Sequence, residues 1–236
     1  MLRVELEPAF ILHPRPFRDT SLLLEVFCRD HGRVGLVARG ARGPRSRLRG
    51  VLQPFRPLLL SWQLRGELGT LTAAEPAGPA VAAPVGGDAL LGLYYLNELL
   101  LRLTARLDPH AELYDVYAGA LAAITSGAPL APALRRFERR LLDALGYGPD
   151  LARDAAGQPI EAAASYRYDP ALGLAGCRPD AAGALLGASV LALGEDRLAD
   201  GRALADARRL LRAALDAHLD GRPLKSREML SRLRRG

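Results

Sequence analysis

The sequence predicts an α+β protein, with an N-terminal OB-fold β-barrel followed by an α-helical bundle that carries a small irregular insertion. Short β-rich runs separated by turn residues fill the first 75 residues, and apolar residues at helical spacing dominate from residue 89 onward. Between them, residues 76–88 contain three prolines and three glycines, which disfavour both helix and strand. We therefore expect a DNA-binding barrel domain over residues 1–78 and a helical domain over residues 84–236.

Five short strands at this spacing are typical of a small barrel with one long loop. The predicted strands are residues 9–13, 21–28, 33–39, 57–63 and 67–74. The second and third are joined by a polar link that ends in Gly32, as a hairpin requires. Residues 40–50 are rich in glycine and arginine, so we expect a mobile basic loop there.

The second half of the chain is expected to be helical, with Asp88 as a candidate N-cap for the first helix. The predicted helices are residues 89–104, 110–125, 131–145, about 200–219, and a short basic one from Lys225. The first has almost no polar face, which indicates a buried position, and Glu98 and Arg102 are spaced to pair on its one polar stripe. Helical periodicity disappears at about 149–182, where we expect an irregular insertion containing one short strand and turn.

Positive charge is distributed unevenly along the chain. The formal net charge is +6, but residues 1–72 hold 12 arginines and 6 acidic residues, whereas residues 73–236 hold 20 charges of each sign. Within residues 29–56, eight arginines face a single acid, Asp30. The phosphates of a nucleic-acid backbone are closely spaced negative charges, and the guanidinium is a planar group with several donors. This segment is therefore more typical of a nucleic-acid-binding surface than of an ordinary solvated surface.

Arginines of this region are the candidate DNA contacts. They are Arg15, Arg18, Arg33, Arg39, Arg42, Arg45, Arg47 and Arg49. Single-strand binders also use aromatic platforms for bases. Phe27 and Trp62 lie in predicted strands and are expected to be mainly core residues, whereas Phe17 lies in a proline-stiffened loop over residues 13–19 and suits either stacking or packing.

Two further basic clusters occur outside the barrel. In residues 135–140 the arginines are spaced one helical turn apart, beside apolar residues. This pattern fits a binding site for an acidic peptide with a hydrophobic end, and it fits an ordinary exposed helix face equally well. Arg135, Arg136 and Arg139 are the candidate contacts for that partner. The basic tail from Arg222 to Arg235 suits a second DNA contact or a solvated end.

Residues with catalytic or metal-binding patterns are missing from the sequence. Cys28 and Cys177 are far apart and too few for a four-cysteine site, and the four histidines are dispersed. No nucleophile, phosphate-loop, metalloprotease or dinucleotide motif occurs. We therefore expect no enzyme activity, no metal and no cofactor. The start of the chain has no apolar signal region, and no stretch reaches the roughly 18 apolar residues of a membrane span, so a soluble cytoplasmic protein is expected.

Several blocks of sequence, in order, resemble the RecO family of DNA repair and recombination mediator proteins. They are residues 10–27 and 31–42, then 52–60, 92–100, 134–138, 145–148 and 223–228. The resemblance covers nearly the whole chain, and an ordered series of blocks is more specific than any single motif.

The resemblance implies an N-terminal OB-fold, a helical domain and an inserted element that in many members binds zinc through four cysteines. Only Cys177 lies in the insertion here, so we expect a degenerate zinc-finger-like element without zinc. It also implies that the protein anneals complementary strands, binds the acidic C-terminal tail of single-stranded-DNA-binding protein, and works with RecR to load a RecA-type recombinase. Arg135, Arg136 and Arg139 are our candidates for the acidic tail.

The leading hypothesis is a nucleoid-associated bacterial recombination mediator that binds single- and double-stranded DNA without sequence preference. Two other kinds of protein stay open at this point. A basic adaptor would bind acidic protein segments, with DNA incidental, and an OB-fold protein of this charge would also suit RNA. A nuclease would need metal-dependent cleavage, which we do not expect.

Overall fold

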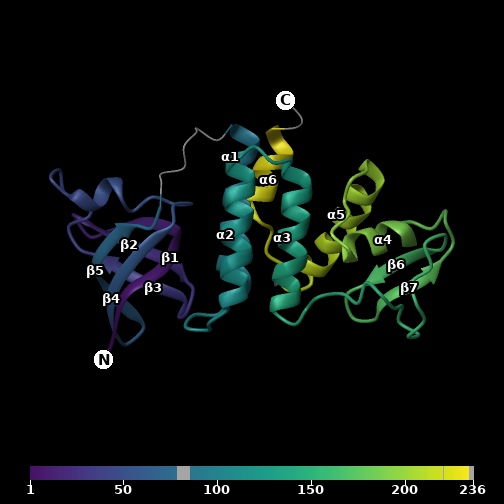
Figure 1. Ribbon diagram of the computed structural model, residues 1–236, viewed down its shortest axis with the longest axis horizontal. Helices are drawn as coiled ribbons and strands as arrows, with labels where there is room; N and C mark the ends of the chain where they lie inside the picture. The colour runs from purple at the N-terminus through teal and green to yellow at the C-terminus, as the bar shows by residue number, and fades with distance from the viewer. Residues whose placement is uncertain (79–85, 220, 234–236) are drawn as a thin grey trace. The chain divides into compact units, whose positions relative to one another are not determined.

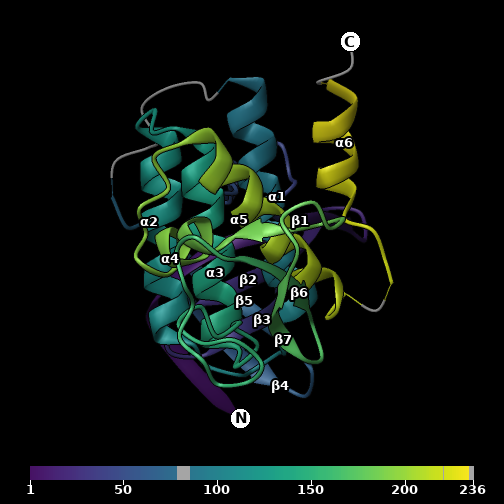
Figure 2. The ribbon, with the colours of Figure 1, turned by 90° about the vertical axis from the view of Figure 1, so that its right-hand side faces the viewer.

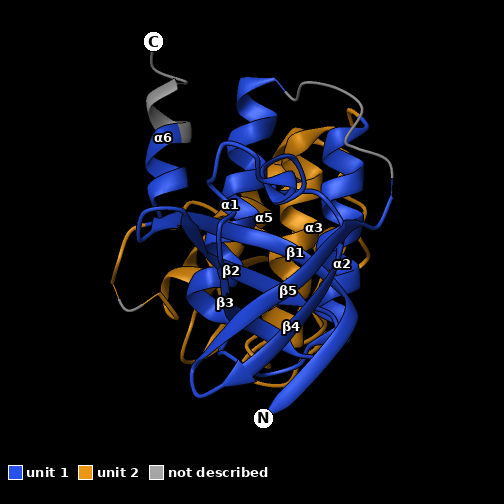
Figure 3. Ribbon diagram, turned by 90° about the vertical axis from the view of Figure 1, so that its left-hand side faces the viewer, with its two compact units in different colours: residues 1–126, 224–236 blue, residues 127–223 orange. Residues whose placement is uncertain are grey.

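The computed structural model describes residues 1–78, 86–219 and 221–233 (Figure 1). These form two compact units, one of residues 1–126 and 224–236 and the other of residues 127–223 (Figure 3). Strands dominate the start of the chain and helices the remainder, which confirms the α+β class. Residues 79–85, which include most of the predicted linker, lie outside the described residues, and the boundary at 78–84 stays a prediction.

Five strands of the first unit close into a barrel in the order β1-β2-β3-β5-β4. Their bounds are β1 Leu2–Phe17, β2 Ser21–Cys28, β3 Gly32–Ala38, β4 Leu58–Arg65 and β5 Leu68–Pro76. Neighbouring strands pair antiparallel except β3 and β5, which run parallel. β1 is long enough to pair with both β2 and β4, which closes the sheet. This five-stranded closed barrel confirms the predicted OB-like domain.

The first strand is much longer than predicted, and the predicted loop over residues 13–19 is wrong up to Phe17, with only residues 18–19 lying in a turn. Pro14 pairs with Leu24 and Pro16 with Leu22, so the strand continues to Phe17. Pairing of β1 with β4 ends at Ala9, which leaves the later part of β1 with one open edge. Because the two prolines are two residues apart, their nitrogens face the same edge, where a missing N–H interrupts no ladder.

The barrel core consists of the side chains that alternate inward along the strands. Ile11, Leu24, Leu36 and Leu60 are fully buried, and Trp62 lies among them with no exposed surface. Phe27 is also fully buried, and its ring contacts those of two tyrosines of the second helix. The expectation that Phe27 and Trp62 are core residues is therefore confirmed.

Three helices complete the first unit: α1 Gly87–Leu103, α2 Ala111–Thr125 and α6 Lys225–Leu233. Buried polar groups tie α1 and α2 to the barrel. The Asn97 side chain donates to the Leu12 carbonyl at 2.8 Å and accepts from the Tyr117 hydroxyl at 2.5 Å. Each of these buried groups is thereby satisfied, which a buried amide and phenol require.

Glu98 of α1 holds the start of α6. Its carboxylate accepts from the Lys225 backbone N–H at 3.0 Å and from the Ser226 N–H and hydroxyl at 2.9 and 2.6 Å. A carboxylate at a helix N-terminus satisfies orphan N–H groups and complements the helix dipole. The predicted pair with Arg102 is present at 3.9 Å, but the cap is the closer interaction.

The second unit combines helices with a small sheet. Its helices are α3 Leu130–Ala144, α4 Gly187–Gly194 and α5 Gly201–Asp216, and its strands are β6 Ser165–Asp169, β7 Gly173–Cys177 and β8 Leu185–Leu186, in the order β7-β6-β8. α5 packs against α3 and α4 and lies beside this sheet (Figure 2). The insertion is therefore more regular than predicted, and α4 was not predicted at all.

The insertion is held by packing and by aspartate side chains that accept backbone hydrogen bonds. Tyr166 and Leu174 are almost fully buried. Asp150 Oδ1 accepts from two N–H groups in one turn, and Asp154 Oδ1 accepts from two in the next, at 2.9 to 3.1 Å. Such turns pin a chain locally through the side chain of one residue. The zinc-finger-like character of this element stays a prediction.

Candidate nucleic-acid interface

The long connection between β3 and β4 is folded against the barrel, so the expectation of a mobile loop is not supported. It contains a 3₁₀ helix, Arg47–Gly50. The Arg42 N–H donates to the Thr20 carbonyl at 2.8 Å, and the Leu52 N–H to the Leu48 carbonyl at 2.9 Å. Ala41 and Leu52 are 1% and 3% exposed, so apolar anchors fix both halves of the loop.

The predicted DNA contacts on this loop remain solvent-exposed, while its apolar residues turn inward. The exposed arginines of the loop are Arg39, Arg42, Arg45, Arg47 and Arg49, and the predicted contacts Arg15 of β1 and Arg18 of the β1–β2 turn are exposed as well. Because the apolar side chains of the loop pack against the barrel, the guanidinium groups lie on the outer surface of an ordered segment. An ordered cationic surface pays less entropy on binding a polyanion than a mobile one.

Arginines from two distant segments meet at one place on the barrel. The Arg42 Nη1 donates to the carbonyls of Arg18 and Asp19, both at 3.4 Å, in the turn between β1 and β2. The Arg18 guanidinium lies 5.3 Å from the centroid of the Phe17 ring. Phe17 is half-buried, and this cation–π contact gives it a partner within the protein. The two arginines therefore belong to one basic surface, although 24 residues separate them.

A cleft of about 390 Å³ opens on this surface. It is lined by Pro14, Leu22, Ala41, Arg42, Arg49, Leu52, Gln53 and Pro54. The sequence analysis singled out only the two arginines of this set. For Ala41 and Leu52 the signal was the run of apolar residues within and after the basic loop, which also includes Leu48 and Val51 and is typical of a packed segment.

Arg33 does not belong to the exposed set, and its assignment as a DNA contact stays a prediction. Its side chain is 17% exposed and lies 3.4 Å from the Glu25 carboxylate. Its Nη2 donates to the Thr104 carbonyl at 2.9 Å, and Arg106 also pairs with Glu25. Burial lowers the pKa of the Arg33 guanidinium, with the Glu25 charge opposing that shift. Arg33 therefore fastens the barrel to the segment after α1.

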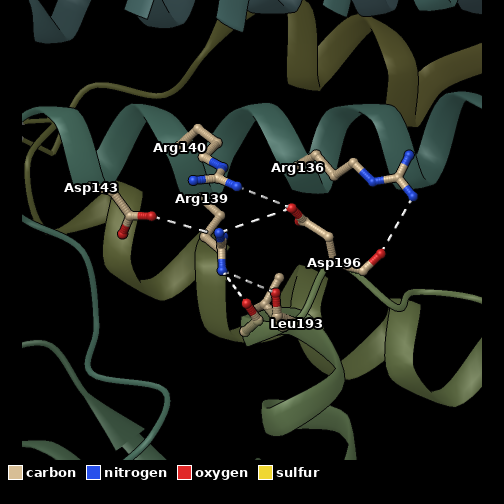
Figure 4. A network of polar contacts seen from close by, with 7 residues as sticks. Arg136, Arg139, Arg140, Asp143, Leu193 and Asp196 are labelled. Carbon is tan, nitrogen blue, oxygen red and sulfur yellow. Dashed lines mark hydrogen bonds and ion pairs between the residues drawn. The ribbon is translucent and has the colours of Figure 1, made fainter. Parts of the chain in front are cut away.

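On α3, two of the three predicted acidic-tail contacts are occupied within the second unit. Arg139 Nη1 donates to the Gly194 carbonyl at 2.6 Å and to the Leu193 carbonyl at 3.4 Å, at the end of α4 (Figure 4). Its side chain is 11% exposed. Arg135 is 12% exposed and pairs at 2.5 Å with Glu138, which is buried. Both guanidiniums satisfy internal acceptors, and the assignment of Arg135 and Arg139 as partner contacts stays a prediction.

The exposed part of the α3 ridge consists of Arg136 and Arg140. Figure 4 shows Asp196 opposite both side chains. Arg136 Nη2 reaches the Asp196 carbonyl at 3.4 Å, and Arg140 Nη2 reaches its carboxylate at 3.3 Å with 51% of the Arg140 side chain exposed. These contacts are long and solvent-accessible, so an incoming carboxylate would compete with them at little cost.

Of the basic tail, only the start is described with its side chains. Arg222 and Lys225 are exposed, and the Arg227 guanidinium lies 5.9 Å from the centroid of the Tyr95 ring. Arg234 and Arg235 lie outside the described residues.

Within the described ranges, no group of three or more His, Cys, Asp or Glu side chains is gathered to hold a metal ion. Searching the same residues finds no helix that is both long enough and apolar enough to span a membrane.

Comparison with known proteins assigns the whole chain to one family. The family model "Recombination protein O N terminal" matches residues 1–80, and "Recombination protein O C terminal" matches residues 86–228. A "DNA repair protein RecO" of Alkalilimnicola ehrlichii is 49% identical over 240 residues, covering 99% of this chain and 93% of that protein. Proteins of the same name from Xanthomonas campestris and Chromobacterium violaceum are 47% and 48% identical, covering 98% and 97% of this chain and 98% and 95% of those proteins. The chain therefore belongs to the RecO family of DNA-repair and recombination proteins.

Proposed function

We propose that this protein is a non-catalytic, cytoplasmic and nucleoid-associated recombination mediator in DNA repair. In this role it binds single- and double-stranded DNA without sequence preference and anneals complementary strands. With RecR, it helps to load a RecA-type recombinase onto DNA coated by single-stranded-DNA-binding protein. Family membership supports the repair role, and the exposed arginines of the barrel supply the DNA-binding surface.

The observation that carries the DNA-binding part is the convergence of exposed arginines from the β1–β2 turn and the β3–β4 loop. Guanidinium groups on this surface neutralise phosphates and release their counterions, which is independent of base identity. A cationic surface also screens the repulsion between two strands, so annealing needs no bond chemistry. Arg15, Arg18, Arg39, Arg42, Arg45, Arg47 and Arg49 are the proposed contacts.

Reversing Arg42, Arg45 and Arg47 to Glu tests this surface. Titration of a labelled single strand at several salt concentrations should give weaker binding and a salt slope flatter by about 2 log units, from about 0.7 for each lost phosphate contact. Duplex binding and strand annealing should fall in parallel. A variant whose affinity and slope match the wild type would show that DNA does not bind here.

A matched control reverses the same number of charges on the second unit. Arg167, Arg178 and Arg197 are exposed there, and their replacement by Glu alters net charge equally. We expect this control to retain most of the affinity and the wild-type salt slope. An equal loss in both triple variants would favour a general effect of net charge over a defined surface.

For the protein partner, we propose that Arg136 and Arg140 bind the acidic tail of single-stranded-DNA-binding protein. Their guanidiniums are exposed and their present contacts with Asp196 are long. Replacing both by Glu should abolish binding of a peptide with that tail's acidic sequence, measured by calorimetry, while DNA affinity is retained. Unchanged peptide binding would move the partner site elsewhere.

The alternative functions differ in the ligand that they predict for the barrel arginines. A basic adaptor would bind the acidic peptide through the barrel arginines, so the triple Glu variant would lose peptide rather than DNA. An RNA-associated protein would prefer an RNA single strand to DNA of the same sequence. Direct competition between the two nucleic acids separates that case.

A further inference from the structure

The cleft on the barrel has an interior of different chemistry from its rim. Leu52 and Ala41 belong to the barrel core beneath it, and its accessible apolar lining comes from the half-buried Leu22, Pro14 and Pro54. A phosphate backbone alone needs only cations, and these apolar groups would contribute nothing to its binding. The lining therefore indicates a ligand with an apolar part that enters the cleft.

The rim of the cleft is cationic. Arg42 Nη1 reaches the carbonyls of Arg18 and Asp19 at 3.4 Å, and Gln53 Nε2 donates to the Arg49 backbone carbonyl at 2.9 Å. The Gln53 amide carries both donor and acceptor groups, as the edge of a nucleobase does. Two guanidiniums beside an apolar cavity with one amide complement an anion joined to a flat ring with a polar edge.

A single strand of nucleic acid has this chemistry, whereas a duplex does not present it. In a duplex the base faces are stacked and only phosphates and groove edges are accessible. In a single strand a base is free to leave the stack and pack between apolar side chains. The volume of about 390 Å³ lies in the range of small-ligand sites, so one base with its sugar fits in size.

We infer that the cleft accepts one unpaired nucleobase of a DNA single strand, while Arg42 and Arg49 bind the phosphates on either side of it. This inference rests on the proposed DNA-binding function and adds a contact specific for single strands. Stacking tolerates every base, because each has an apolar face, so the protein remains without sequence preference. The arginines on the surrounding surface bind both strand forms, and the cleft favours the unpaired one.

A first experiment compares two ligands of equal charge on the wild-type full chain. One is an oligothymidylate, and the other is an abasic oligomer of the same length with the same sugar-phosphate backbone. We expect the abasic oligomer to bind about tenfold more weakly, within the range that one stacked base contributes, with the same salt slope. Equal affinities would overturn the inference.

A second experiment removes the lining without changing charge. In the double variant Leu22→Ala with Gln53→Ala, we expect oligothymidylate affinity to fall to that of the abasic oligomer. Duplex affinity, abasic affinity and the salt slope should be unchanged. Thermal unfolding reports whether the barrel is intact. The matched control is Leu172→Ala with Gln158→Ala, which removes the same atoms from exposed positions of the second unit.

The outcomes separate the cleft from the surface around it. If the wild type prefers oligothymidylate and the double variant keeps that preference, bases are bound elsewhere and the inference is wrong. If an acidic peptide with an aromatic end loses binding in the double variant while base preference persists, the cleft binds protein instead. Failure of the proposed function has a different signature, which is an unchanged salt slope in the triple Glu variant.

Discussion

Replacing Arg139 by Ala should destabilise the second unit far more than replacing Arg136, three residues earlier on the same helix. Arg139 donates to the Gly194 carbonyl at 2.6 Å and the Leu193 carbonyl at 3.4 Å, with only 11% of its side chain exposed. Carbonyl groups at a helix C-terminus have no partner within the helix, so this guanidinium caps α4.

The magnitude follows from these contacts. A hydrogen bond from a charged donor contributes about 1.5 to 3 kcal/mol. Loss of the Arg139 donor removes the short contact to the Gly194 carbonyl, whereas the Leu193 carbonyl still accepts from the Asp196 N–H at 3.3 Å. The pairs of Arg139 with Asp143 and Asp196, at 3.8 and 4.0 Å, add little. We expect a total of about 3 kcal/mol for Arg139→Ala. For Arg136→Ala we expect less than about 0.5 kcal/mol, because an exposed contact at 3.4 Å is its main interaction.

The assay is unfolding in urea followed by far-ultraviolet circular dichroism, with hydrogen exchange of α4 amides to localise the effect. Arg139→Lys should fall between wild type and Ala, because an ammonium retains the charge but not the planar fork that reaches two carbonyls. Equal stability of the Arg139 and Arg136 variants would refute this reasoning. So would a loss of acidic-peptide binding in Arg139→Ala with no loss of stability.

Three further predictions follow from Glu98 and the two cysteines. Glu98→Gln should weaken the cap of α6 and raise hydrogen exchange in that helix by about tenfold or more, from a loss near 1.5 kcal/mol, and unchanged exchange would contradict the cap. Cys177 should react with a thiol reagent before Cys28, because burial raises the pKa of the Cys28 thiol and excludes the reagent. Since Cys28 stays protonated when folded and ionises near pH 8.5 when unfolded, folding stability should fall as pH rises above about 8.5, and Cys28→Ala should lessen that fall.

Elements with strong periodicity were predictable from the sequence. The bounds of β2 match the prediction at both ends, and α2 and α3 differ from theirs by one residue. The predicted strand was shorter than β1 because prolines are typical of turns. Only the strand pairing shows that these prolines lie on an open edge of the sheet. α4 is eight residues long and almost wholly apolar, so it lacks the polar face by which a helix is recognised.

The sequence predicted the positive charge of the candidate site, but it did not predict which of its arginines are buried. The arginines of the β3–β4 loop are exposed as predicted, whereas Arg33 and Arg139 belong to equally basic segments and are largely buried. Whether an arginine faces solvent depends on acceptors that other parts of the chain bring to it, here Thr104 and Gly194. These partners are distant in the sequence, so the residues around each arginine do not predict them. The cleft was missed for the same reason.

The cap that Glu98 places on α6 has a consequence for the order in which the protein is made. Because α6 follows residues 127–223 in the chain, the 97-residue second unit is synthesised before the first can be completed. At ordinary translation rates the ribosome needs roughly 5 to 20 s for such a segment. During that interval α1 exposes the surface that α6 later covers, and the Glu98 carboxylate has no helix N-terminus to cap. We expect this surface of α1 to be accessible to chaperones throughout that time.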